Sequence, residues 1–219
     1  MKQIILTFCA ATLLLLACNN DKTSETKTDA TSDKASTESA DKPKAWVPID
    51  SAMMEKAWKE SMAITEHHKM LAKASGTWNA DVTMWMAAGA PPMKSTATTV
   101  NTMIFGGLYQ QSKHNGNMMG APFEGISTTA YDNVAKEYIS TWIDNMGSGI
   151  MVMKGNWDEA SKSVNLSGTM KNPANGMDCT IREVFKNVDD NTQVLEMYGP
   201  DPQTGKEFKT MEIKYTRKK

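Results

Sequence analysis

Residues 76–217 alternate between short runs of strand-forming residues and clusters of turn residues, and this pattern constrains the fold most. In the run 136–144, Tyr138, Ser140 and Trp142 share one face, and apolar residues also occur on the other. A repeat of two residues is typical of a strand, and a strand apolar on both faces needs cover on both. The predicted strands span 76–87, 94–104, 108–114, 123–131, 136–144, 149–157, 163–170, 177–188, 193–198 and 206–217.

The connections between these runs are short and rich in Gly, Pro, Asn and Asp, as in Ala90-Pro91-Pro92, Asn115-Gly116 and Asp189-Asp190-Asn191. Short connections join antiparallel neighbours, and no helical crossover separates the runs. We therefore predict an all-β domain over residues 76–219, an antiparallel up-and-down barrel of about ten strands. A barrel of about eight strands is just filled by its side chains or holds one small ligand, and ten strands leave more room.

Several short motifs recur in a fixed order along this region. They are Gly76-Thr77-Trp78, Phe105-Gly106-Gly107, G-x-P-F-E-G from Gly120 to Gly125, Tyr131-Asp132, Tyr138, Trp142-Ile143-Asp144 and MEIKYTR over 211–217. Together, over residues 67–218, they resemble DUF1579, a bacterial family of unknown function. The resemblance implies a calycin-like barrel related in shape to lipocalins, and it supplies no activity and no catalytic residues.

Residues 46–75 form a predicted helical lead-in of one or two helices. Asp50 or Ser51 can cap the first helix, and Thr65 can cap a second over 65–73. The first helix carries an apolar stripe made of Met53, Met54, Ala57, Trp58 and Met62. We expect this stripe to pack on the barrel or plug its mouth, with contact to a membrane surface as the alternative.

The first 17 residues predict a targeting signal. Lys2 supplies a positive start, and the apolar run 4–16 is too short for a stable membrane span. It ends in Leu15-Leu16-Ala17-Cys18, which resembles a bacterial lipobox, in which the Cys18 thiol receives a lipid. An ordinary secretory signal is the alternative. Lipidation at Cys18 predicts a membrane anchor carrying acyl chains such as palmitate.

Residues 18–45 carry the predicted lipidated Cys18 and a tether of Ser, Thr, Asp, Lys and Ala. They include almost no apolar residues and so cannot order themselves by burial. We expect the tether to hold the barrel off the membrane, in the bacterial cell envelope. Asn19 is not Asp, which favours the outer membrane under the sorting rule known for some bacteria.

The amino-acid composition limits the classes of molecule that this protein is expected to bind. A net charge of -1 argues against nucleic-acid binding. The 18 Met in 219 residues suit adaptable core filling or a pliable ligand pocket. A third interpretation is Cu(I) binding by Met118, Met119, Met151 and Met153 with His114. Once Cys9 leaves with the signal and Cys18 is lipidated, Cys179 has no partner for a disulfide within the chain.

Enzyme motifs are missing: the sequence has no G-x-S-x-G, no glycine-rich phosphate loop, no H-E-x-x-H and no C-x-x-C. We therefore predict no catalytic residues, no metal and no cofactor. His114 is expected to be solvated beside the Asn115-Gly116 turn. An enzymatic alternative would use Asp144 or Glu124 as general acid or base near Trp142 and Tyr131.

The favoured interpretation is a noncatalytic envelope lipoprotein that binds a small apolar or amphipathic ligand in the barrel. Arg182 or Glu212, with Tyr215 and Trp142, is predicted to form a polar point in an apolar cavity. The full set of candidate ligand-binding residues is Trp78, Phe123, Tyr131, Trp142, Arg182, Glu212 and Tyr215. The alternatives are a structural or interaction lipoprotein without ligand and the methionine-based copper site.

Overall fold

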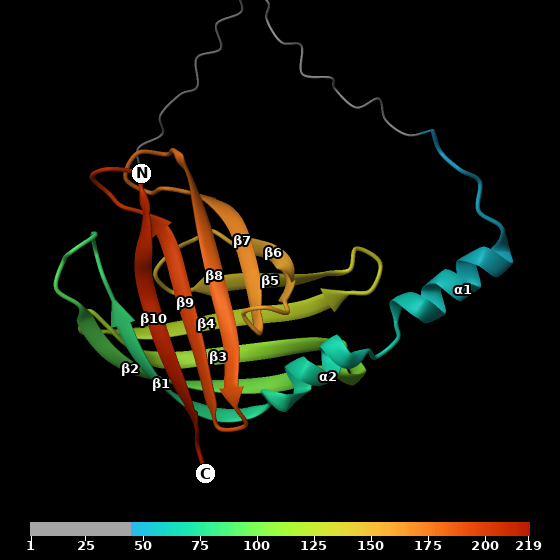
Figure 1. Cartoon of the computed structure of the whole chain (residues 1–219), viewed down its shortest axis with the longest axis horizontal. Coiled ribbons are helices and arrows are strands. Elements are labelled where there is room, and N and C mark those ends of the chain that lie inside the picture. Colours follow the sequence, from blue (N-terminus) through green and yellow to red (C-terminus); the bar gives the residue numbers. More distant parts are fainter. Residues whose placement is uncertain (1–44) are drawn as a thin grey trace, which may run out of the picture. The chain divides into compact units, whose positions relative to one another are not determined.

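Within residues 45–219, which this computed structural model describes, ten antiparallel strands close into a barrel (Figure 1). The predicted signal, Cys18 and the tether up to residue 44 lie outside the described residues. Each strand pairs with its neighbours in sequence, and β1 also pairs with β10, which closes the sheet. The strands are β1 (Gly76–Met84), β2 (Met93–Ile104), β3 (Tyr109–Met118), β4 (Ala121–Asp132), β5 (Glu137–Asp144), β6 (Met151–Asp158), β7 (Ser163–Lys171), β8 (Asp178–Asp189), β9 (Thr192–Pro200) and β10 (Glu207–Arg217).

The predicted fold is confirmed: an up-and-down barrel follows two N-terminal helices, α1 (Ser51–Ser61) and α2 (Glu66–Lys73). A short 3₁₀ turn, η1 (Phe105–Gly107), joins β2 to β3. In the described part of the chain, neither helix has the length and apolar character needed to cross a bilayer.

One predicted turn is wrong. Strand β3 runs through Asn115 and Gly116, and the chain reverses instead at Met119 and Gly120, which have φ angles of 52° and 83°. Gly116 is needed for close strand approach, because a Cβ there would lie 2.8 Å from the Cβ of Ala97. The Asn-Gly pair therefore continues the β2–β3 ladder rather than ending it.

Strand register assigns every alternate residue to the interior. Two buried apolar clusters result, one beneath α2 and one along β1 and β10. The first contains Leu71, Tyr138, Met153, Val164 and Leu166, and the second contains Trp78, Ala80, Val82 and Tyr215.

Helix α2 covers one end of the barrel. Its last carbonyls lack partners within the helix, as at any helix C-terminus, and inward-facing side chains supply them. The Trp78 indole N–H and the Asn101 amide donate to the Ala74 carbonyl at 2.8 and 2.9 Å, and Gln110 donates to Leu71 at 2.6 Å. Because these donors are part of the barrel wall, they fasten the helix to the barrel end.

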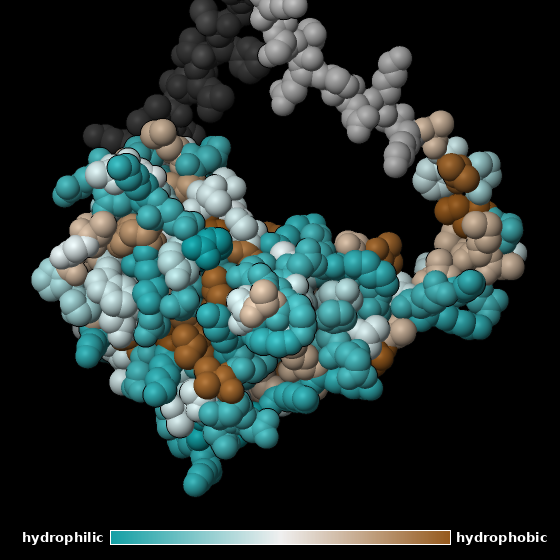
Figure 2. All heavy atoms as spheres, in the orientation of Figure 1, coloured by the Kyte–Doolittle hydropathy of each residue, from teal (hydrophilic) through white to brown (hydrophobic). Residues whose placement is uncertain are grey.

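Helix α1 does not pack on the barrel or plug its mouth, so that expectation is wrong. Asp50 caps it as predicted, but Met53, Trp58 and Met62 are 57%, 63% and 60% exposed, and apolar side chains gather along the helix (Figure 2). Its connection to the barrel is through Asn133, which donates to carbonyls at and just after the helix end. A polar contact of this kind holds the end of α1 and leaves its apolar stripe free.

Candidate functional site

The inward faces of β8, β9 and β10 carry apolar side chains that are only partly buried. Their apolar residues point inward by register, yet they remain partly accessible, unlike the buried residues near α2. These residues are Ile181, Phe185, Leu195, Met197, Met211 and Ile213. Ile181 packs against the first buried cluster, and Leu195, Met211 and Ile213 pack against the second, so this wall extends the core while keeping some exposed apolar surface.

Glu183 supplies the carboxyl group of this wall. It lies on the inward face of β8, in register with Leu166 on β7 and Met197 on β9. The carboxyl group is enclosed by protein, while part of the side chain still borders the lumen, and this burial raises its pKa to about 7. Burial and the nearby Glu183 charge also raise the pKa of Tyr215. Among residues 45–219, no cationic side chain forms an ion pair with Glu183.

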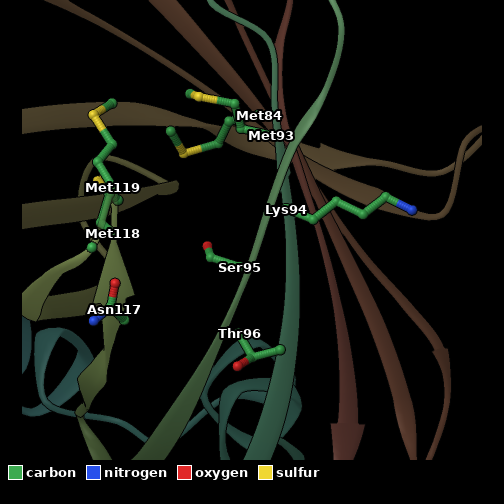
Figure 3. A pocket seen from close by; sticks show the side chains of 9 residues that line it. Met84, Met93, Lys94, Ser95, Thr96, Asn117, Met118 and Met119 are labelled. Carbon is green, nitrogen blue, oxygen red and sulfur yellow. The ribbon is translucent and has the colours of Figure 1, made fainter.

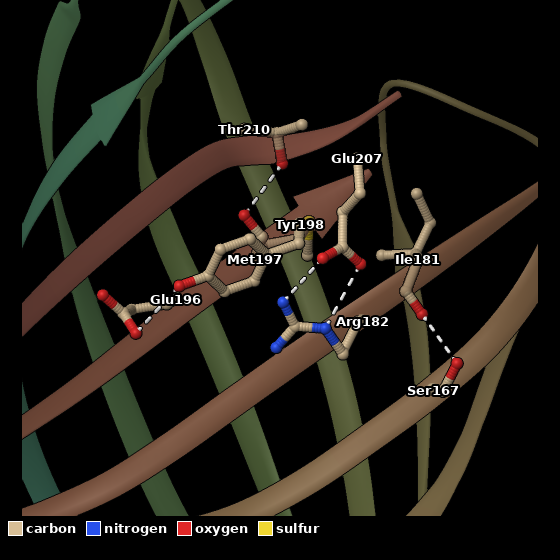
Figure 4. A network of polar contacts seen from close by, with 8 residues as sticks. All are labelled: Ser167, Ile181, Arg182, Glu196, Met197, Tyr198, Glu207 and Thr210. Atoms are coloured by element: carbon tan, nitrogen blue, oxygen red, sulfur yellow. Dashed lines mark hydrogen bonds and ion pairs between the residues drawn. The ribbon is translucent and has the colours of Figure 1, made fainter. Parts of the chain in front are cut away.

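Arg182 and Glu212 do not form the predicted polar point. Both occupy outward positions, since each alternates with an inward neighbour. Arg182 pairs with Glu207 at 2.8 Å and lies 3.9 Å above the ring of Tyr198 (Figure 4). Glu212 pairs with Lys209 on the same outer surface.

The carboxyl group on the inward face of β8 is therefore that of Glu183, which the sequence prediction did not select. The available signal was its place between Ile181 and Phe185, the more apolar face of that strand. Tyr215 does point inward, and it is buried beside Glu183, with 6% of its surface exposed. A role for Tyr215 in ligand binding stays a prediction.

Phe123 and Trp142 lie together on the opposite wall. Their rings stack with centroids 6.2 Å apart, and the Trp142 indole N–H donates to Asp144 at 2.6 Å. Trp142 also covers Gly125, where a Cβ would come within 2.5 Å of its ring. These aromatic groups form a continuous inner surface on β4 and β5.

His114 belongs to the same wall rather than to a solvated turn. Its Nδ1 lies 2.9 Å from the Thr99 hydroxyl, and its ring meets Trp142 edge-on at 5.0 Å. Burial lowers the pKa of His114 to about 4, so the imidazole is neutral at pH 7. The expectation that it is solvated is wrong, because β3 continues past it into the barrel wall.

The end beneath α2 carries two of the aromatic residues picked out from the sequence. Tyr131 stacks on His67 with ring centroids 3.8 Å apart, and His67 Nδ1 lies 2.8 Å from the Tyr138 hydroxyl. Trp78 is fully buried, and Arg217 lies 4.2 Å above its ring. These groups fasten the helix and close the floor of the lumen.

The two carboxylates of the enzymatic alternative, Asp144 and Glu124, lie on opposite faces of the sheet. Glu124 is exposed on the outer face of β4. Asp144 accepts hydrogen bonds from Trp142 and from the backbone N–H of Met146, as a turn residue does. Asp144 therefore lies beside Trp142 as predicted, and an acid–base role for either residue stays a prediction.

Four methionines line a cavity of about 340 Å³ at the end of the barrel opposite α2 (Figure 3). The cavity opens where β2 and β3 separate, beyond the last pair, Ala97 and Gly116. Its lining residues are Met84, Met93, Lys94, Ser95, Thr96, Asn117, Met118, Met119 and Gly120.

The methionines of the proposed copper site lie in different parts of the barrel. Met118 and Met119 line this cavity, whereas Met153 is buried beneath α2 with Leu71 and Tyr138. Nor do the described residues bring together three His, Cys, Asp or Glu side chains that could hold a metal ion.

A lipocalin-like barrel, closed by the β1–β10 pairing and covered at one end by α2, is thus the class that the structure defines. The chain belongs to the family described as protein of unknown function (DUF1579), whose model matches residues 63–217. A solved structure, the S-type phycobiliprotein lyase CPES from Guillardia theta, has a similar fold with a TM-score of 0.52 and 9% identity. The match covers 74% of this chain and 97% of the lyase. No curated protein matches the chain.

Proposed function

We propose that this protein is a noncatalytic binding module that holds a small apolar or amphipathic ligand in the barrel lumen. The observation that carries this proposal is the partly accessible apolar surface on the inward faces of β8–β10, inside a closed sheet. A cavity lined by apolar side chains with few polar groups is the usual form of a small-molecule site. Helix α2 closes one end, so a ligand enters from the other.

The phycobiliprotein lyase indicates that a barrel of this shape also supports enzymes. Binding without catalysis is favoured in this chain because its sequence lacks common enzyme motifs and its candidate acids, Glu124 and Asp144, lie on opposite faces of the sheet. The accessible methionines at the open end suit such a role, since flexible thioether side chains adapt to ligands of different shape.

The test is mass spectrometry of the purified protein under nondenaturing conditions. We expect a bound small molecule, and we expect Met197→Trp, which fills the lumen beside Glu183, to lower its occupancy about tenfold or more. Val152→Trp is the matched control, because Val152 is 46% exposed on the outer face of β6. A bare protein mass, or equal occupancy in both variants, would count against a lumen ligand.

We further infer that the chain is a lipoprotein of the bacterial cell envelope, anchored through Cys18. The lipobox-like Leu15-Leu16-Ala17-Cys18 and the polar stretch after it support this inference. Each buried CH₂ of an acyl chain contributes about 0.8 kcal/mol to membrane binding, so a multiply acylated cysteine gives a durable anchor.

Substitution Cys18→Ser is expected to abolish incorporation of labelled palmitate and to move the protein out of the membrane fraction. Cys179→Ser is the control, since Cys179 is a free thiol in β8. Label that persists in the Cys18 variant, or is lost only in the Cys179 variant, would show that Cys18 is not the acceptor.

A further inference from the structure

We propose that the lumen ligand carries a cationic, hydrogen-bond-donating head group, such as a primary amine, and that the Glu183 carboxylate binds it. This inference rests on the proposed function and adds the chemical class of the ligand. It starts from the position of Glu183 midway along the inward face of β8.

The surroundings of Glu183 select an amphipathic molecule. Leu166 and Met197 flank it in register, and Ile181 and Phe185 lie on the same face. The Glu183 side chain is half-buried, so a guest held inside the barrel would lie against it. A ligand that places one polar group on Glu183 would rest its apolar part on these neighbours.

The charged groups on the inward face of the barrel favour a cationic ligand, because none of them compensates Glu183. The other titratable groups on inward strand positions are His114, Tyr131, Tyr138, Asp144, Cys179, Tyr215 and Arg217. His114 is neutral beside Thr99, and Asp144 is engaged by Trp142. Arg217 donates to the carbonyls of Lys73 and Ser75 at 2.7 Å, so its guanidinium group is engaged by the backbone at the C-terminal end of α2.

The nearby lysines do not compensate Glu183 either. Lys186 on β8 and Lys214 on β10 occupy outward positions, on the face opposite Glu183 and Tyr215. A buried carboxylate without a cation is unfavourable, which is why burial raises the pKa of Glu183 to about 7. A bound ammonium group would supply both the missing charge and the hydrogen-bond donors.

The experiment compares three probes of equal chain length, namely dodecylamine, dodecanol and dodecanoate, below their micelle-forming concentrations. Affinities are measured by calorimetry on the whole protein at pH 7.5. We expect the amine to bind about tenfold or more tightly than the alcohol, and dodecanoate to bind most weakly, because charge-assisted hydrogen bonds are the stronger kind.

Two variants assign the preference to one residue. Glu183→Gln is expected to bind amine and alcohol equally, because the carboxamide keeps the shape and removes the charge. Glu212→Gln is the matched control, as it removes a carboxyl from the outer surface, and it should keep the preference of the unaltered protein.

The outcomes separate the two proposals. Equal binding of amine and alcohol, tighter binding of dodecanoate, or a preference that survives in Glu183→Gln would overturn the cationic-ligand inference and leave lumen binding intact. Failure of all three probes to bind the unaltered protein would overturn both.

Discussion

Replacing Glu183 with glutamine is expected to raise the free energy of unfolding by about 3 kcal/mol at pH 8 and to change it little at pH 4. The pKa of Glu183 is about 7 in the folded protein, against 4.5 for an ordinary glutamate. One pKa unit corresponds to about 1.4 kcal/mol between protonation states. Since the carboxyl group is enclosed by the barrel, most of this difference should appear as stability.

The direction of this pH dependence follows from where the Glu183 proton binds more tightly. The folded state holds the Glu183 proton more tightly than the unfolded chain, so the protonated form favours folding. That stabilisation is fully present below pH 4.5 and is lost as the pH rises through 7. The variant with glutamine has no proton to lose and therefore keeps its stability above pH 7.

Urea denaturation of the ligand-free protein at pH 4, 6 and 8 measures this effect. The midpoint urea concentration reports the change in stability, provided that the dependence of the unfolding free energy on urea concentration keeps the same slope. Glu212→Gln serves again as control, since that carboxyl lies on the outer surface beside Lys209, and its profile should parallel that of the unaltered protein. Identical pH profiles for the Glu183 variant and the unaltered protein would show that this carboxyl group is not destabilised by the barrel interior.

Replacing Trp78 with alanine is expected to lower the free energy of unfolding by about 3–5 kcal/mol, the usual range for a buried tryptophan. The side chain is fully buried, lies under Arg217 and caps α2 through the 2.8 Å bond to Ala74. The substitution leaves a cavity in the second cluster and removes one of the donors that fasten the helix end.

Thermal and urea unfolding measure this loss, and Trp58→Ala is the matched control. Trp58 is 63% exposed on α1, so its replacement should change stability by about 0.5 kcal/mol or less. Trp78→Phe should fall between them, because it keeps apolar volume and loses the hydrogen bond. Similar losses for the Trp78 and Trp58 variants would show that the floor of the barrel is not organised around Trp78.

The sequence alone did not decide which charged residue of β8 faces the barrel interior. Glu183 and Arg182 are adjacent, so one must face inward and the other outward. The strand has apolar residues on both faces, such as buried Val184 and inward Phe185, and periodicity alone did not select between them. Pairing with Leu166 on one side and Met197 on the other decides that Glu183 points into the lumen.

Local chemistry in the sequence was sufficient for the elements themselves. Strand periodicity, short polar connections and the caps at Asp50 and Thr65 specify ten strands and two helices, because these signals act over a few residues. The turn at Asn115-Gly116 is the exception, since a close contact with Ala97 overrides its local preference.

Only the tertiary structure decided which face of each strand is inside, that α2 rather than α1 covers the barrel, and that Glu183 lacks a counter-charge in the described residues. These properties depend on pairs far apart in sequence, above all the β1–β10 pairing that closes the sheet. A single strand carries its alternation of residues, but its inside is defined by the strands on either side.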